Sequence, residues 1–317
     1  MAYVPVGAST QNPGLQHQAA VYYDRKGLSR LYPMLQFNRI GYRKPLPLKS
    51  GRTVQMYRFN IPGANLVPAA EGVVPNPVPM SSYTISATVE QYTDFTTTST
   101  LYEETDISNT IEEAVSTISF RGARSADTIT RLEVDSNTSQ IVDTVGANLT
   151  AADFKIQTTL MAGLNVMPYG NGDWMSVVHP YCIYDLMSDN TAGGFIDSMK
   201  YSAGTQVLNG EIGKIAGCRI LRSTNVGNDG TAAPATKYYN YIFGYQAFAV
   251  IDLQGRGPKD VVDPANQRFK VEVFSDPKSL ADPTGEIGTV VRYRFVYAAK
   301  TTDPQRLKIV RADASVI

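Results

Sequence analysis

Residues 105–135 have the sequence TDISNTIEEAVSTISFRGARSADTITRLEVD, and this stretch decides the fold. Apolar and small residues recur in it at steps of three and four, the spacing that places side chains on one face of a helix. These are Ile107, Ile111, Val115, Ile118, Gly122, Ala126 and Ile129. The stretch therefore predicts one long amphipathic helix, and the small side chains at Gly122 and Ala126 leave room for a sheet to pack closely.

Upstream of this helix, residues 52–98 predict a long two-stranded arm. Residues 52–61 alternate, with Tyr57, Phe59 and Ile61 on one face, and residues 82–95 alternate in the same way. The segment between them holds five prolines, which cannot donate to a ladder and make the tip irregular but stiff: Pro62, Pro68, Pro75, Pro77 and Pro79. Because an isolated ribbon is marginal in water, we expect the arm to lean on a neighbouring subunit.

The rest of the chain mixes helices and strands without a regular βαβ order, which predicts an α+β fold. Residues 1–45 predict an N-terminal arm whose aromatic residues dock on another surface: Tyr22, Tyr23, Tyr32 and Phe37. In the middle we expect helices at 150–163 and 181–187 and strands at 175–179, 213–223 and 239–253. Three strands close the chain, at 268–274, 289–299 and 306–312.

Composition excludes several classes of protein. The 317 residues are 43% hydrophobic and 18% charged, with 29 basic and 29 acidic residues. This is the composition of a globular chain and not of a disordered one. Zero net charge argues against nucleic-acid binding as the main role, because such proteins are usually basic. We find no signal peptide and no apolar run of the ~20 residues that span a bilayer, and two cysteines are too few for a disulfide framework.

Residues that carry chemistry are sparse. His179 and Cys182 lie three apart and could form a nucleophile pair or half of a metal site. Zinc needs three or four such ligands, and only His17 and Cys218 remain. We interpret the pair as a strand-end histidine and a buried cysteine. The expectation is no catalytic residue, no cofactor and no metal.

Two pairs of acids, Glu103-Glu104 and Glu112-Glu113, stand near the start of the long helix. Paired carboxylates can serve acid catalysis or bind a metal. At a helix start, however, negative charge interacts favourably with the helix dipole. We interpret these residues as solvated or facing a partner.

Charge is distributed very unevenly along the first 120 residues. Residues 1–60 hold nine Lys or Arg and one Asp, a formal charge of +8, whereas residues 61–120 hold eight acids and no base, a charge of −8. Three interpretations stay open: pairing within one chain, pairing between copies of the chain, and contact of the basic segment with nucleic acid. The candidate contacts between subunits are Arg39, Arg43, Arg52, Arg58, Glu71, Glu90, Glu103 and Glu104.

The order of arm, ribbon, long helix, mixed domain and returning strands resembles the Hong Kong 97-type capsid fold of tailed bacteriophages. Local sequence is similar to the N-four-like phage coat protein family over about residues 40–310. The similar motifs are EGV at 71–73, EQY at 90–92, GEIGKIAG at 210–217, FGYQAF at 243–248, and Asp282-Pro283 followed by GEIGTVVRY at 285–293. Thr284 and Arg292-Tyr293 depart from that family's pattern, which leaves the subfamily open.

The resemblance implies five parts. They are an N-terminal arm, an extended loop, a peripheral domain with a spine helix, an axial domain and the return strands of the peripheral domain, at residues 1–45, 46–98, 99–149, 150–267 and 268–317. It implies copies arranged as hexamers and pentamers of an icosahedral shell that encloses double-stranded DNA. The shell would assemble in the host cytoplasm and end in the virion.

The resemblance also implies partners. They are a portal protein and a separate scaffolding protein, since about 45 residues before the ribbon are too few for a fused scaffold. A decoration protein stays open, and no membrane partner is expected. Two other functions compete. An encapsulin-type compartment shares the fold, and co-purified cargo enzyme in place of DNA would favour it. A cysteine hydrolase built on Cys182 and His179 would be favoured by labelling with an electrophilic probe.

Overall fold

The computed structural model describes residues 35–47, 50–68, 71–72, 74, 76–105, 110–170, 172–189, 211–215, 217–231, 236–252, 269–275 and 287–315. The chain forms two compact units. The smaller unit holds residues 95–118 and 272–292 of this described part, and the larger unit holds the rest. Helices and strands are mixed in several sheets, as an α+β chain requires.

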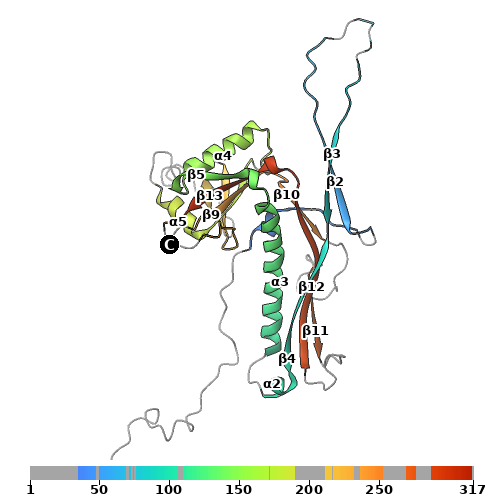
Figure 1. The fold of residues 1–317 in the computed structure, drawn as a ribbon, viewed down its shortest axis with the longest axis vertical. Coiled ribbons are helices and arrows are strands. Elements are labelled where there is room, and N and C mark those ends of the chain that lie inside the picture. The colour runs from blue at the N-terminus through green and yellow to red at the C-terminus, as the bar shows by residue number, and fades with distance from the viewer. Residues whose placement is uncertain are drawn as a thin grey trace, which may run out of the picture. The chain divides into compact units, whose positions relative to one another are not determined.

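The long helix predicted at the centre of the chain is confirmed as α3, Thr110–Asp135 (Figure 1). Its 26 residues give a length of about 39 Å at 1.5 Å per residue. The buried positions are Ile118, Gly122, Ala126, Asp127, Thr130 and Val134. Ile111, Val115 and Ile129, which we expected in the buried stripe, are only partly buried, and Ile107 lies outside the described residues.

Polar residues take the place of Ile129 in the buried stripe because each has a hydrogen-bond partner. The Thr130 and Tyr297 hydroxyls lie 2.6 Å apart. The Asp127 carboxylate accepts bonds from the Asn225 amide at 2.8 Å and the Asn38 backbone N–H at 3.0 Å. A pattern of apolar residues cannot show such partners in advance.

A six-stranded mixed sheet forms the core of the larger unit. Its strands, in spatial order, are β5 (Ile141–Asn148), β13 (Leu307–Asp313), β9 (Tyr238–Phe243), β6 (Trp174–Val178), β8 (Cys218–Arg222) and β7 (Glu211–Ile215). Helices α4 (Ala151–Gly163) and α5 (Pro180–Ser188) bury residues in the same apolar cluster as the sheet residue Ile242. Both helices were predicted, and α4 begins with a capping box formed by Thr150 and Asp153.

The opposite face of this sheet packs on aromatic residues. Tyr241 and Phe243 alternate with Ile242 along β9, so they point away from α4 and α5. Phe37 of the short helix α1 (Phe37–Ile40) is fully buried and meets the Tyr241 ring edge-on at 5.0 Å. Of the four aromatic residues that we expected to dock on another surface, Phe37 does so, and the surface belongs to its own chain. The other three, Tyr22, Tyr23 and Tyr32, lie outside the described residues.

The second sheet has five strands. Four lie in the order β1 (Tyr42–Arg43), β10 (Phe248–Asp252), β12 (Ile287–Thr301) and β11 (Phe269–Ser275), and β4 (Glu90–Ser99) pairs with β12. The three closing strands predicted from sequence are confirmed as β11, β12 and β13. In the smaller unit, Thr98 of β4 donates to the Thr289 carbonyl at 3.2 Å and to the Glu103 carboxylate of α2 (Thr100–Thr105).

Two predicted single strands are pairs of strands. Residues 213–223 form the hairpin of β7 and β8, turned at Gly217, whose φ of +77° favours glycine. Residues 239–253 divide into β9 and β10, which belong to different sheets, around Gln246 at a φ of +56°. Neither run contains a proline or a cluster of polar residues between its two strands, so no polar loop marked the division.

Candidate functional site

The ribbon predicted from the alternating sequence carries, with its loop, nine of the large apolar residues that are exposed in the described part of the chain. Strands β2 (Thr53–Phe59) and β3 (Ser82–Thr88) pair in antiparallel register, from Thr53 opposite Thr88 to Phe59 opposite Ser82 (Figure 1). The Asn60 backbone N–H donates to the Ser81 carbonyl at 3.0 Å and extends the pairing by one step. This confirms the two-stranded arm.

One prediction about the ribbon is wrong: residues 82–95 do not form one strand. The strand breaks at Val89, and β4 then pairs with β12 instead of β2. Val89 is buried, and its N–H still bonds to the Arg52 carbonyl at 2.8 Å, one step before β2 begins. The alternation continues through the break, so the sequence could not show where the partner changes.

The base of the ribbon is anchored in the larger unit. Val54 and Met56 of β2 and Ala87 of β3 point to the same side and are buried in one apolar cluster with Val89, Leu46, Ala249, Ile251 and Ala298. Arg58 lies on that same side by alternation. Its guanidinium lies 2.5 Å from the carboxylate of Asp303, a residue that is itself buried.

Beyond the base, the ribbon exposes apolar side chains. Tyr57 and Phe59 lie on the face opposite the buried one and are 64% and 61% exposed. The other exposed apolar residues of the ribbon and its loop are Ile61, Leu66, Val67, Val74, Val78, Met80 and Tyr83. We call these nine residues the ribbon surface. Single apolar side chains scattered over a surface are common and need no explanation. Many of them gathered on one exposed element indicate an interaction site.

The structure places the charged residues proposed from sequence at separate sites. Arg39 is in α1, Arg43 in β1 and Arg52 just before β2, and all three are exposed. Glu71 lies in the ribbon loop and Glu90 at the start of β4, both exposed, while Glu103 and Glu104 lie in α2. Arg58 has an intrachain partner in Asp303, outside the acidic segment.

Within the described part of the larger unit, no ion pair joins the basic segment 1–60 to the acidic segment 61–94. The one acid there with an ion pair is Asp94, and its partner 2.7 Å away is Arg121 of α3. Whether these segments meet between copies therefore stays a prediction.

His179 and Cys182 do not form a reactive pair. The His179 ring stacks on Tyr238 at 4.0 Å, and its Nδ1 accepts the Tyr181 backbone N–H at the start of α5. Burial lowers the pKa of His179 to about 4, and the imidazole is neutral at pH 7. Cys182 is fully buried, which raises the pKa of its thiol to about 12. A nucleophilic cysteine needs a lowered pKa and access to substrate, and this one has neither.

The described residues form neither a metal site nor a membrane-spanning helix. Among the described residues, no group of three or more His, Cys, Asp or Glu side chains is placed to hold a metal ion. Gly172 lies in a turn, with a φ of +75° and a bond from its N–H to the Tyr169 carbonyl at 2.8 Å. No described helix is long and apolar enough to cross a membrane.

Comparison with known proteins identifies the fold. No family model matches the chain, and no curated protein matches its sequence. Solved phage structures match over nearly the whole length. The capsid of the cyanophage P-SCSP1u is 12% identical, with 97% of each chain covered and a TM-score of 0.71.

Two further structures agree. The head of the Helicobacter pylori bacteriophage KHP40 is 11% identical, with 99% of this chain and 100% of that chain covered and a TM-score of 0.71. The capsid of Ralstonia phage GP4 is 13% identical, with 99% of each chain covered and a TM-score of 0.67. The chain therefore has the α+β fold of phage capsid proteins.

Proposed function

We propose that the chain is the major capsid protein of a tailed bacteriophage and not an enzyme. In this proposal it has the Hong Kong 97-type architecture. Residues 1–45 are its N-terminal arm, 46–98 its extended loop, 99–149 and 268–317 its peripheral domain, and 150–267 its axial domain. Copies of the chain assemble in the host cytoplasm as hexamers and pentamers of an icosahedral shell, which encloses double-stranded DNA in the virion.

The observation that carries this proposal is the ribbon surface on a phage capsid fold. A ribbon that leaves Tyr57 and Phe59 more than half exposed does not bury them by folding alone. Association with another copy would remove this apolar area from water, at roughly 25 cal/mol per Å². The proposed partners beyond the homo-oligomer are a separate scaffolding protein, a portal protein and, as a further candidate, a decoration protein.

The test is shell formation by the full chain, produced with and without the scaffolding protein of its own genome. Sizing chromatography and negative-stain microscopy should show capsomers or closed shells. Replacing Tyr57 and Phe59 together by Ser should abolish shells while leaving the unfolding midpoint within a few degrees of wild type. Thr84→Ser, opposite Tyr57 on the same exposed face, is the matched control and should assemble normally. A chain that stays monomeric under all these conditions would refute the proposal.

The contents of the shells separate the proposal from the encapsulin-type alternative. Shells purified from infected cells should contain double-stranded DNA, detectable by nuclease-protected nucleic acid. Shells that contain a cargo enzyme and no DNA would support a protein compartment instead.

A further inference from the structure

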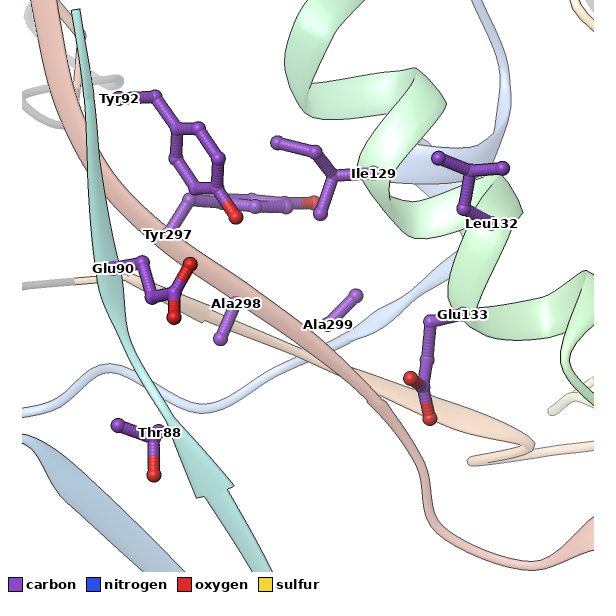
Figure 2. A pocket seen from close by; sticks show the side chains of 9 residues that line it. All are labelled: Thr88, Glu90, Tyr92, Ile129, Leu132, Glu133, Tyr297, Ala298 and Ala299. Atoms are coloured by element: carbon purple, nitrogen blue, oxygen red, sulfur yellow. The ribbon is translucent and has the colours of Figure 1, made fainter.

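A hollow lies between strand β4, strand β12 and the second half of helix α3, and the residues that line it all belong to the larger unit (Figure 2). Its volume is about 510 Å³, and it is open to solvent. The lining residues are Thr88, Glu90, Tyr92, Ile129, Leu132, Glu133, Tyr297, Ala298 and Ala299. We propose that this hollow binds a lysine or arginine side chain from the first 60 residues of a second copy of the chain. The inference rests on the proposed shell function.

The lining suits a long side chain with a charged end. Figure 2 shows Ile129 and Leu132 on the helix side and the rings of Tyr92 and Tyr297 across from them. Leu132 is 55% exposed although it lines the hollow, so apolar surface remains uncovered there. Lysine and arginine bury aliphatic stems along such surfaces while the charged head reaches a polar group. Aromatic rings add an attraction for the cation.

Of the two carboxylates that line the hollow, one has no ion-pair partner among the described residues. Glu133 is already neutralised, because Lys300 Nζ lies 3.0 Å from it and the Thr301 backbone N–H donates to it at 3.1 Å. Glu90 forms no ion pair with any described residue. Its charge acts inside the hollow: the pKa of Tyr92 is raised first by burial, then by the negative charge of Glu90 and by the hydrogen bond between the two side chains. A cation at this position would complete the site.

The basic segment of the same chain can supply the cation. Residues 1–60 carry nine bases and one acid. Of the described bases, Arg58 is held by Asp303, whereas Arg39, Arg43 and Arg52 are exposed and form no ion pair with described residues. An excess of cations in one segment and an unpaired carboxylate in another make two copies complementary.

Arg52, which lies across the ladder from the residue before Glu90, faces away from the hollow. The Arg52 carbonyl accepts the Val89 N–H, so Arg52 lies across the ladder from Val89. Side chains alternate along a strand, and Glu90 therefore points to the face opposite that of Val89 and Arg52. This geometry favours a donor from another copy over Arg52 of the same chain.

Cross-linking tests the source of the cation. A photoreactive benzoylphenylalanine replaces Leu132 in the full chain, and shells are assembled from equal amounts of ordinary and nitrogen-15-labelled chains. We expect cross-linked peptides that join one light and one heavy chain and that map to residues 1–60. The same probe at Leu160, 51% exposed on α4, is the control and should not link to that segment. Links only within one chain, or to other segments only, would overturn the inference.

Charge removal at the carboxylate provides a second measurement. Glu90→Gln should raise the concentration needed for assembly about two- to fivefold at low salt, the factor expected for one exposed ion pair. Glu90→Asp keeps the charge and should stay closer to wild type, and the difference should vanish at high salt. Equal behaviour of both variants at low salt would count against the docking site. Absence of wild-type shells would overturn the proposed function as well, whereas normal shells without the expected cross-links overturn the docking alone.

Discussion

The Tyr241 hydroxyl donates a hydrogen bond of 2.6 Å to the carboxylate of Asp135, the last residue of α3. The same hydroxyl accepts the backbone N–H of Gly227 at 3.0 Å. Tyr241 is fully buried in the middle of β9, so one phenol fastens the end of the long helix and a loop to the six-stranded sheet. Arg131 strengthens this junction with a bond to the Val226 carbonyl at 3.2 Å.

Removing this hydroxyl should destabilise the larger unit. Tyr241→Phe keeps the ring but leaves the Gly227 N–H and the Asp135 carboxylate without their buried partner. The expected loss is roughly 1–3 kcal/mol of the free energy of unfolding, measured by urea denaturation. Tyr184→Phe is the control, because that side chain is 58% exposed, and it should change stability by less than about 0.5 kcal/mol. Equal effects of the two substitutions would contradict this account.

Truncation of Ile118 should show that α3 is held by its buried stripe. Ile118 is 2% exposed, and Ile118→Ala should lower the free energy of unfolding by about 2–5 kcal/mol. Leu160→Ala, at a half-exposed position of α4, should cost clearly less. Similar costs at both positions would show that Ile118 is not a core residue.

His179 should make the fold sensitive to acid. Its pKa in the folded chain is lowered by burial to about 4 from an ordinary value of 6.5. The neutral ring therefore contributes stability that is fully present above pH 6.5 and is lost as the pH falls towards 4. His179→Asn keeps a helix-capping acceptor without the titration. Below pH 6.5 the wild type should lose stability relative to this variant, by up to about 3 kcal/mol at pH 4. Parallel stability curves for the two proteins would refute the assignment.

Two arginines of the basic segment should respond differently to charge reversal. Arg58→Glu places a carboxylate beside the buried Asp303, so it should destabilise the chain as well as impair assembly. Arg52→Glu changes an exposed side chain and should leave the unfolding midpoint unchanged while slowing assembly at low salt. Light scattering measures assembly, and thermal unfolding measures stability. Normal assembly of Arg52→Glu at low salt would remove this residue from the candidate contacts.

Cys182 should be inert in the native chain. A thiol with a pKa of about 12 and no exposed surface is not available as a thiolate at pH 7.5. Thiol titration with a chromogenic disulfide should detect neither Cys182 nor the equally buried Cys218 until denaturant is added. Rapid labelling of Cys182 in the folded protein would revive the hydrolase alternative.

The sequence predicted those helices and strands whose buried residues recur at a regular interval. The long helix, the ribbon and the closing strands all appear near their expected residues because each buries one regular face. The pattern failed where burial is two-sided or where polar groups are buried. The run at 239–253 contains no proline and no cluster of polar residues, although it crosses from one sheet to the other at Gln246.

The candidate site, too, could be predicted only where it follows a local pattern of residues. Alternation placed Tyr57 and Phe59 on one face of β2, and the register confirms it. Nothing local indicated that Arg58 would reach Asp303, which lies 245 positions later in the chain, or that Glu90, Ile129 and Tyr297 would line one hollow. Such relationships depend on the path of the whole chain.

The position of β13 within its sheet has a consequence for synthesis on the ribosome. This strand, Leu307–Asp313, lies between β5 and β9 and is hydrogen-bonded to both. A nascent polypeptide that has not yet reached residue 307 leaves β5 without its neighbour and one edge of β9 open. The six-stranded sheet therefore closes only after nearly all of these residues have left the exit tunnel, and truncated translation products lack a complete core.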